Sequence, residues 1–404
     1  MSEWRADFPA LQGTMNGKPL AFLDSAASAQ KPQVVLDKVM ATLSGHYANI
    51  HRGLYEYSQR TTAEFEAVRG KVANFLNAKS ENEIVFTRNS TEAINLVAHA
   101  WGQHYLHADD EVILTEMEHH ANIVPWHLLR DLTGIVIKYI PVTQTGELDL
   151  SKLEGLLTKK TRLVSFVHVS NALGTINDAA SIVAQVRAYN PDIKILVDGS
   201  QSAVHMPTDV QKLGCDWFVC TGHKLYGPTG VGVLWGRGEI LAKTPPYQGG
   251  GDMIERVALH GIKYREPPQR FEAGTPPIVE VIGLGAAIDY MQGLGWDKIT
   301  AHENALSRQL YGRLSARKDL RIIGTSPNRA GIVSFLMDGA SSADVGMILD
   351  QCGVAVRTGH HCCQPLLGIF GVEGTIRASL ALYSTEADID ALETGLDKAR
   401  KLLA

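Results

Sequence analysis

The sequence places a lysine where it could do chemistry. Lys224 ends the segment Thr221-Gly222-His223-Lys224, after an apolar run over residues 217–220 and before a glycine-rich turn. The run predicts a buried strand, and burial lowers the pKa of a lysine amine, which frees its lone pair to form an imine with an aldehyde. A lone lysine at a strand end more often only extends its charge into solvent, so the interpretation depends on its neighbours.

An acidic residue ends the apolar run that precedes this lysine. Residues 193–197 are mostly apolar, and Asp198 and Gln201 follow. In an open parallel sheet the carboxyl ends of the strands border the ligand crevice, so Asp198 and Lys224 are expected in one cavity. Pyridoxal 5'-phosphate needs a carboxylate that keeps its pyridine nitrogen protonated, and Gln201 could bond its ring hydroxyl. Alone, Asp198 is equally typical of a turn, but with Lys224 it favours this cofactor.

A polar turn that could hold the cofactor's phosphate follows another apolar run. Asn89, Ser90, Thr91 and Glu92 come directly after residues 83–88. A helix that begins near Ser90 or Thr91 would offer free backbone amides and two hydroxyls to an anion. An ordinary helix cap has the same pattern, so the turn alone does not decide. The helix itself is predicted by an apolar stripe at helical spacing: Ala93, Leu96, Val97, Ala100 and Trp101.

These segments require a scaffold, and the chain predicts an α/β fold. Seven strand-like runs alternate with helical stretches, at 84–87, 112–115, 135–141, 163–168, 193–198, 217–220 and 231–235. Their hydrophobicity is continuous rather than alternating, which is typical of strands buried on both faces. We therefore predict a large domain with a mostly parallel seven-stranded sheet covered by helices.

The remainder predicts a smaller α+β domain. Residues 246–278 are rich in glycine and proline and are expected to form no regular element. After them we expect four helices: one at 279–291, one that ends at 316, one at 343–351 and one that begins at 385. Strands are expected at 320–323 and 331–336. The predicted domains are residues 21–285 for the large one, and 1–20 with 286–404 for the small one.

Composition excludes several classes. The 404 residues are 45% hydrophobic, with a net charge of -5 and scattered basic residues, so neither nucleic acid nor an acidic membrane is expected as a partner. No apolar run reaches 18 residues and the first ten lack a signal-peptide core, so we expect a soluble, cytoplasmic protein. Five cysteines without a CxxC pair argue against disulfides and zinc ribbons. Cys215, Cys220 and Cys352 are predicted to be inert core residues.

The third chemical cluster runs from Arg357 to Pro365 and contains two histidines followed by Cys362 and Cys363. Histidine and cysteine are zinc ligands, but four adjacent residues cannot easily all face one ion, so no metal site is predicted. A thiol beside an arginine and two imidazoles is better explained as an exposed nucleophile with a lowered pKa.

Six segments together resemble the group II cysteine desulfurases, the branch of the class V aminotransferase-like enzymes that includes SufS, CsdA and selenocysteine lyases. They are 23–28 (LDSAAS), 51–53 (HRG), 118–122 (EHHAN), 198–201 (DGSQ), 221–228 (TGHKLYGP) and 357–362 (RTGHHC), in order within a match from about Trp4 to the C-terminus. The resemblance implies a pyridoxal 5'-phosphate-dependent transferase of fold type I. It also implies a homodimer that takes sulfur from L-cysteine and releases L-alanine.

The resemblance further implies residue roles. Lys224 matches the Schiff-base lysine, Asp198 the partner of the pyridine nitrogen, and Gln201 the partner of the ring hydroxyl. His119 matches an imidazole that stacks on the ring, and Cys362 the nucleophile that becomes a persulfide. The other matches are the phosphate ligands Ser90, Thr91, Thr221 and His223, a phosphate ligand from the neighbouring subunit, Thr275, and the substrate-binding residues Arg377, Asn171, Arg357, Ala26 and Ala27.

Two positions depart from the family pattern. Cys363 stands where a small residue such as alanine is more common, and Asn89 where glycine is expected. Because successive side chains on an extended loop point to opposite sides, only one thiol should face the cofactor, and Cys362 directly follows the histidine pair. The close setting of Arg357 and Pro365 predicts a short, ordered loop. The persulfide would then need an acceptor that approaches it, by resemblance a small protein of the SufE or SufU kind that supplies iron-sulfur cluster assembly.

Three alternatives remain. A selenocysteine lyase, acting on L-selenocysteine, or another fold-type I enzyme would share Asp198 and Lys224. A non-catalytic metal or cluster scaffold would use the run from His360 to Cys363. A Rossmann dehydrogenase is disfavoured because no G-x-G-x-x-G follows the first strand.

Overall fold

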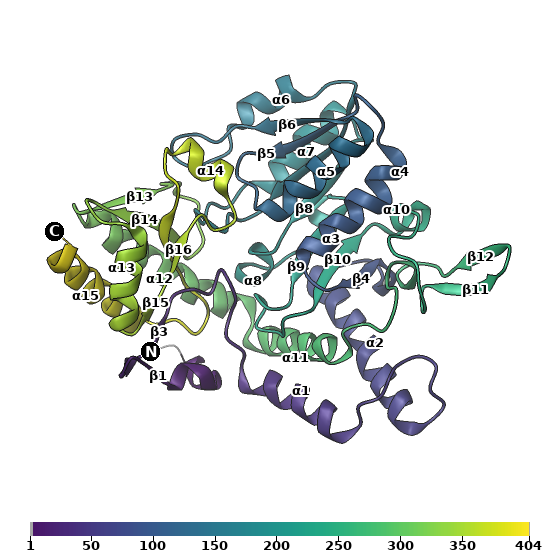
Figure 1. Ribbon diagram of the computed structural model, residues 1–404, viewed down its shortest axis with the longest axis horizontal. Coiled ribbons are helices and arrows are strands. Elements are labelled where there is room, and N and C mark those ends of the chain that lie inside the picture. The colour runs from purple at the N-terminus through teal and green to yellow at the C-terminus, as the bar shows by residue number, and fades with distance from the viewer. Residues whose placement is uncertain (1–2, 404) are drawn as a thin grey trace.

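The computed structural model describes residues 3–403 as a seven-stranded sheet covered by helices, with a four-stranded sheet beside it (Figure 1). In the large sheet β10 runs antiparallel to both neighbours and all other adjacent strands are parallel. The predicted mostly parallel sheet is confirmed. In spatial order its strands are β4 (Ile84–Thr87), β10 (Gly232–Gly236), β9 (Trp217–Thr221), β8 (Lys194–Asp198), β7 (Thr161–Val167), β5 (Glu111–Thr115) and β6 (Val136–Ile140).

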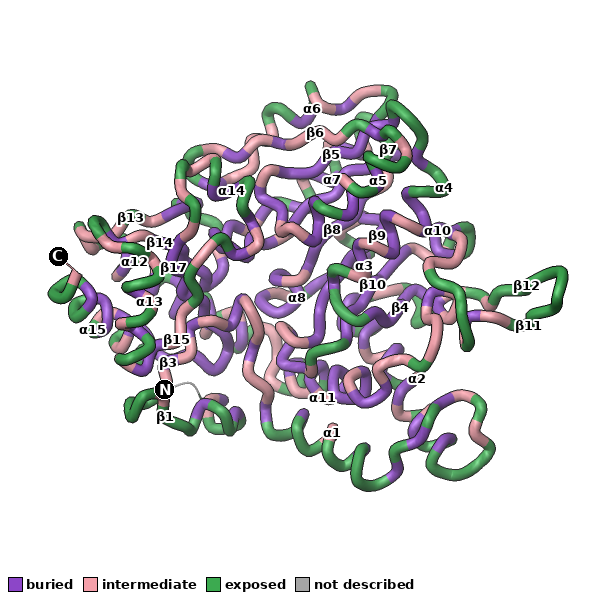
Figure 2. Tube along the Cα trace, viewed as in Figure 1, coloured by how far each residue is buried: buried purple, intermediate pink, exposed green. Residues whose placement is uncertain are grey.

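Apolar clusters cover both faces of this sheet, which explains the continuous hydrophobicity of its strands. In β9, Phe218 and Cys220 belong to one cluster, whereas Trp217 and Val219 belong to the other. Figure 2 shows buried positions concentrated in the central sheet. The edge strand β6 is the exception, because most of its residues are partly exposed.

Helices fill the connections between the strands. The predicted apolar stripe is buried, but it spans α3 (Ser90–Leu96) and then a π-helical turn over Val97–Gly102 rather than one regular helix. The other helices of this part are α1 (Gln33–Gly45), α2 (Glu56–Leu76), α4 (Gln103–Tyr105), α5 (Val124–Thr133), α6 (Leu153–Leu156), α7 (Ala179–Tyr189), α8 (Ser202–His205), α9 (Val210–Leu213), α10 (Gly238–Lys243) and α11 (Ile278–Leu294).

The smaller sheet has the order β13-β14-β17-β16. Its strands β13 (Leu320–Ile323) and β14 (Ile332–Met337) were predicted, but β16 (Arg357–Gly359) and β17 (Thr375–Ser379) were not. Its helices are α12 (Trp296–Ala316), α13 (Ser342–Gln351), α14 (Gln364–Ile369) and α15 (Glu386–Leu403). Near the N-terminus β1 (Thr14–Met15) pairs with β2 (Lys18–Pro19), and β3 (Ala21–Phe22) pairs with β15 (Val354–Ala355). The domain boundaries stay a prediction.

Two expectations were wrong. Residues 246–278 contain a regular hairpin of β11 (Ile254–Ala258) and β12 (Gly261–Tyr264), which projects from the body (Figure 1). The hairpin has no buried face, so no pattern of burial marked its strands. Cys352, the C-cap of α13, packs against an apolar cluster but is only partly buried, whereas Cys215 and Cys220 are buried, as predicted.

Among residues 3–403 no single helix is both long and apolar enough to cross a membrane. The helices α11 and α12 pass that test only as a pair, and they meet at a bend of 83°.

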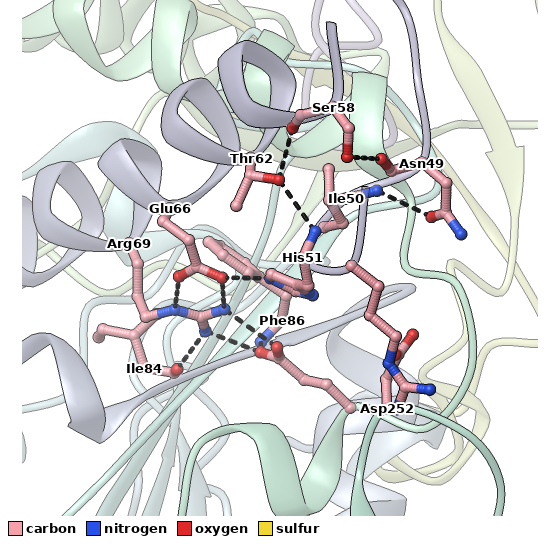
Figure 3. A network of polar contacts seen from close by, with 12 residues as sticks. Asn49, Ile50, His51, Ser58, Thr62, Glu66, Arg69, Ile84, Phe86 and Asp252 are labelled. Atoms are coloured by element: carbon pink, nitrogen blue, oxygen red, sulfur yellow. Dashed lines mark hydrogen bonds and ion pairs between the residues drawn. The ribbon is translucent and has the colours of Figure 1, made fainter. Parts of the chain in front are cut away.

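A buried arginine ties several segments together (Figure 3). Arg69 of α2 is 2% exposed and bonds both carboxylate oxygens of Glu272, at 2.8 and 3.0 Å. Its Nε donates to Glu66 at 2.9 Å, and the other oxygen of Glu66 bonds His51 Nε2 at 2.8 Å. Burial would raise the pKa of Glu66, but the bonds from His51 and Arg69 lower it to about 2. The loop that carries His51 and the segment around Glu272 are thereby held on α2.

Replacing this arginine tests how much the fold depends on it. Arg69→Met keeps the aliphatic stem but leaves the Glu272 carboxylate buried and unpaired, which should lower the free energy of unfolding by about 3–5 kcal/mol. Urea denaturation at pH 7 and one fixed protein concentration measures it. Arg130→Met, which removes the partner of the exposed Asp131, should cost under about 1 kcal/mol. Equal losses in the two variants would contradict the assignment.

Candidate functional site

A cavity of about 420 Å³ lies at the carboxyl ends of β7, β8 and β9, where the loop after β16 and strand β17 approach the large sheet. Fourteen of the fifteen predicted site residues line it, and Thr275 does not. Thr275 is exposed in this chain. The lining residues are Lys224, Asp198, Gln201, His119, Ser90, Thr91, Thr221, His223, Cys362, Arg377, Arg357, Asn171, Ala26 and Ala27.

Lys224 follows β9, and burial lowers the pKa of its amine to about 8 although the nearby Asp198 opposes the shift. The turn before it needs glycine, because a Cβ at Gly222 would lie 2.6 Å from Val231. Asp198 ends β8 and is buried. Its Oδ1 accepts bonds from the N–H and hydroxyl of Ser200, at 2.9 and 2.5 Å, whereas its Oδ2 has no partner within residues 3–403.

The cavity contains buried polar atoms without partners. Gln201 donates through Nε2 to the carbonyl of Ala26 at 2.7 Å, but its Oε1 accepts no bond from any residue in 3–403. The hydroxyl of Thr221 is also buried, and it too has no partner among the residues that the structure describes. A buried polar atom without a partner costs free energy, so these atoms are suited to a bound polar ligand.

The polar turn before α3 is both a helix cap and an open set of donors. Asn89 is the N-cap, and its side chain accepts from the N–H of Glu92 at 2.9 Å. The Ser90 hydroxyl lies 2.8 Å from that of Ser200. The N–H groups of Ser90 and Thr91 have no partner in the described part of the chain and remain available to an anion.

His119 is a neutral imidazole at the cavity. Burial, helped by the nearby charge of Lys224, lowers its pKa to about 4. Its Nδ1 accepts from the N–H of Ala121 at 3.0 Å, so the neutral ring carries its proton on Nε2. Glu118, for which we predicted no role, is fully buried and accepts hydrogen bonds from Asn122 at 2.7 Å and from the N–H of Val167 at 2.9 Å. It fixes the segment that carries His119.

Two arginines from the smaller sheet share one carboxylate. Asp24 accepts from Arg357 through Nε and Nη2, and from Arg377 at 3.1 Å. Arg377 is 2% exposed, and its Nε has no partner in the described part of the chain. Two guanidinium groups against one carboxylate leave a net positive charge, which suits an anionic ligand. We predicted no role for Asp24, although it lies within the motif 23–28.

Of the two adjacent thiols, Cys362 lines the cavity and Cys363 does not. The role of Cys362 as the nucleophile stays a prediction, and the reason given for a single cavity-facing thiol was wrong, because the loop is not extended: His361 and Cys362 have φ of 50° and 56°. Burial raises the pKa of the Cys363 thiol to about 12. Within residues 3–403 no group of three or more His, Cys, Asp or Glu side chains could hold a metal ion.

Residues 21–392 match the class V aminotransferase family. Over 400 residues, 99% of this chain, the sequence is 49% identical to a cysteine desulfurase of Dickeya dadantii (96% of that protein) and to one of Yersinia pestis (98%). The crystal structure of the cysteine desulfurase CsdA from Escherichia coli has a TM-score of 0.92 at 37% identity, covering 100% of this chain and 98% of that one. A cysteine desulfurase from Thermococcus onnurineus NA1 has a TM-score of 0.90 at 35% identity, covering 99% and 97%.

The chain belongs to the cysteine desulfurases of the class V aminotransferase family. These enzymes depend on pyridoxal phosphate, and a related structure at 25% identity and a TM-score of 0.83 (98% of each chain) contains it. The cavity of this cysteine desulfurase fits the cofactor, because it offers a lysine with a lowered pKa, a carboxylate with one unpaired oxygen, and the unpaired atoms of Gln201 and Thr221.

The pKa of Lys224 predicts how its reactivity depends on pH. In the protein freed of cofactor, the amine is neutral only above about pH 8, so its acetylation rate should rise through that pH and level off above it. Competitive labelling with acetic anhydride and mass spectrometry of the Lys224 peptide measures the midpoint. A midpoint near 10.4, as for a solvated lysine, would contradict the effect of burial.

Proposed function

We propose that the chain transfers the sulfur of L-cysteine to Cys362 and releases L-alanine. The observation that carries this proposal is that Cys362, from the smaller part of the fold, lines the same cavity as Lys224 and Asp198. When bound there, pyridoxal phosphate supplies an electron sink that weakens the bonds at the substrate's α-carbon.

The residues that would hold the cofactor each bind a different chemical group of it. Lys224 would bond it covalently through Nζ, and the unpaired Oδ2 of Asp198 would accept from its ring nitrogen. Gln201 would bond the ring hydroxyl. His119 would stack on the ring, with its Nε2 proton available for transfer. The phosphate would bind the hydroxyls and free amides at the start of α3 together with two residues around β9: Ser90, Thr91, Thr221 and His223.

Arg377 is the residue best suited to the substrate's carboxylate. It is buried at the cavity and has an unpaired Nε, and a guanidinium can hold a carboxylate in a fixed orientation. Asn171 and Arg357 would add donors on the same side. Ala26 and Ala27, whose side chains are small, would leave room for the substrate.

The proposed transfer is a nucleophilic displacement at the sulfur atom of the substrate. The thiolate of Cys362 forms a bond to the substrate sulfur, and the substrate's carbon–sulfur bond breaks with its electron pair left on carbon. That carbon takes a proton, for which Lys224 Nζ and His119 Nε2 are the candidate donors, and leaves as L-alanine. The sulfur stays on Cys362 as a persulfide.

Removing the nucleophile tests the proposal. Cys362→Ala should lower alanine formation from L-cysteine by roughly 10²-fold or more while the absorbance of the bound cofactor is kept. Cys352→Ala, which removes a thiol outside the cavity, is the matched control and should leave the rate unchanged. Alanine and sulfide measured together report the rate. Full activity in Cys362→Ala would refute the role of this thiol.

We further infer that the persulfide sulfur passes to a small acceptor protein of the SufE or SufU kind, in support of iron-sulfur cluster assembly. The support is the loop itself: the Cys362 carbonyl accepts from the N–H of His120 at 2.8 Å, so the backbone that carries the thiol is held in place. In the assay above, an acceptor should speed alanine release by the wild-type protein and have no effect on Cys362→Ala. An equal wild-type rate with and without either acceptor would count against this inference.

We also propose a homodimer in which Thr275 binds the phosphate held by its partner. Thr275 is exposed and outside its own chain's cavity, and Gly274 bonds Gly251 at the base of the hairpin. Leu54, near His51, and Leu259, at the hairpin tip, are 91% and 97% exposed. The same two segments also expose more than half of three further apolar side chains: Tyr55, Val257 and Ile262. Exposed apolar side chains that gather in this way are typical of a covered interface.

Sedimentation should therefore give a species of about 88 kDa, twice the 44.0 kDa chain. Leu259→Asp should shift it toward the monomer and reduce alanine formation, because a buried charge opposes association. Met347→Asp alters another exposed apolar residue, on α13, and is the control. A monomeric wild-type protein with full activity would contradict the dimer.

A further inference from the structure

The buried thiol of Cys363 makes one specific polar contact. Its side chain is fully buried, and Sγ lies 3.1 Å from Oδ1 of Asn171. Burial raises the pKa of this thiol to about 12, so it keeps its proton near neutral pH and can donate it to this oxygen. The Oδ1 of Asn171 thus faces Cys363, which supplies its hydrogen bond.

That contact fixes the other end of the amide. With Oδ1 turned to Cys363, the Nδ2 of Asn171 donates to the backbone carbonyl of His361 at 2.7 Å. An amide nitrogen carries two hydrogens, and within residues 3–403 the second has no partner. Asn171 lines the cavity, so this second hydrogen is available to a ligand there.

The carbonyl that Asn171 holds belongs to a strained part of the loop. His361 and Cys362 have φ of 50° and 56°, a left-handed conformation that residues other than glycine adopt only when their surroundings impose it. His361 is also held through its Nε2, 2.8 Å from the hydroxyl of Thr375. The amide of Asn171 is thus one of the few groups that impose the conformation in which Cys362 reaches the cavity.

The body of the fold anchors Asn171 in turn. Its backbone carbonyl accepts from Nη1 of Arg377 at 2.9 Å, and the next carbonyl, of Ala172, accepts from the hydroxyl of Ser334 at 2.6 Å. The turn that carries Asn171 needs glycine, since Gly174 has a φ of 76° and a Cβ there would lie 2.5 Å from a backbone oxygen. With its backbone fixed, the remaining freedom of Asn171 is the rotation of its amide.

We propose that Cys363 is a positioning residue that sets this rotation: its thiol locks the Asn171 amide so that the nitrogen faces both the Cys362 loop and the carboxylate of the substrate. If the amide were rotated by half a turn, its oxygen would face the carbonyl oxygen of His361 and the carboxylate of the substrate. Both contacts would then be repulsive. The proposal rests on the proposed function, because the carboxylate is that of L-cysteine or L-alanine. It gives Cys363 no part as a sulfur carrier, since its thiol has no access to the cavity.

A double-mutant cycle on the holoenzyme tests whether Cys363 acts through Asn171. Cys363→Ala should weaken L-alanine binding, measured by calorimetry, about fivefold and raise the KM for L-cysteine similarly, which corresponds to one hydrogen bond. Cys363→Ser keeps a donor and should restore both values to within about twofold. In an Asn171→Ala background, Cys363→Ala should change neither value, because the group it orients is gone.

Cys215→Ala removes another fully buried thiol far from the cavity and controls for a general loss of stability, which thermal melting reports for every variant. The proposal would be overturned if the fold-changes of Cys363→Ala and Asn171→Ala in L-alanine binding simply multiplied in the double variant. It would also be overturned if Cys363→Ser did not restore binding. Persulfide mapped to Cys363 in the wild-type protein would also overturn it. A wild-type enzyme that binds L-alanine but forms none from L-cysteine would refute the proposed function while the binding cycle still tests Cys363.

Discussion

The cavity has to keep the pKa of one amine, that of Lys224, close to neutral pH. At the same time it has to attract anionic ligands. Burial lowers the pKa of Lys224, and Asp198 opposes part of that effect. Arg377 acts in the same direction as burial, because one positive charge in the cavity disfavours a second. The arginine that suits a carboxylate therefore also helps to keep the lysine reactive, so the charges of the two parts of the site depend on each other.

Asp24 limits the positive charge that results. It follows β3, which pairs with β15, and it bonds arginines that lie on β16 and β17. Burial tends to lower the pKa of Arg377, and the carboxylate of Asp24 offsets part of that effect. Because the N-terminal segment supplies this carboxylate, the first strands and the smaller sheet are joined at the cavity wall.

The elements that could be predicted from the sequence are those in which all residues are buried to a similar extent. The strands of the large sheet are buried on both faces, so an unbroken apolar run marks each one. Strand β17 stayed hidden because Arg377 stands in its middle, and only the cavity explains a buried charge there. In the site, Lys224 and Asp198 were found from their place after apolar runs. Asp24 and Cys363 were not given roles, because their partners lie 353 and 192 residues away in the chain.

The separation in sequence also explains why the conformation of the loop around Cys362 was not predicted. Two adjacent residues other than glycine in the left-handed region cost on the order of 1–3 kcal/mol each, so contacts outside the loop must hold them. Those contacts come from Asn171 and from the N–H of His120, both on the large sheet's side of the cavity. A thiol held from the opposite wall is oriented toward the cavity before any substrate arrives. Under the proposed function these contacts would also keep the loop from carrying sulfur away, which supports our inference that an acceptor comes to the enzyme.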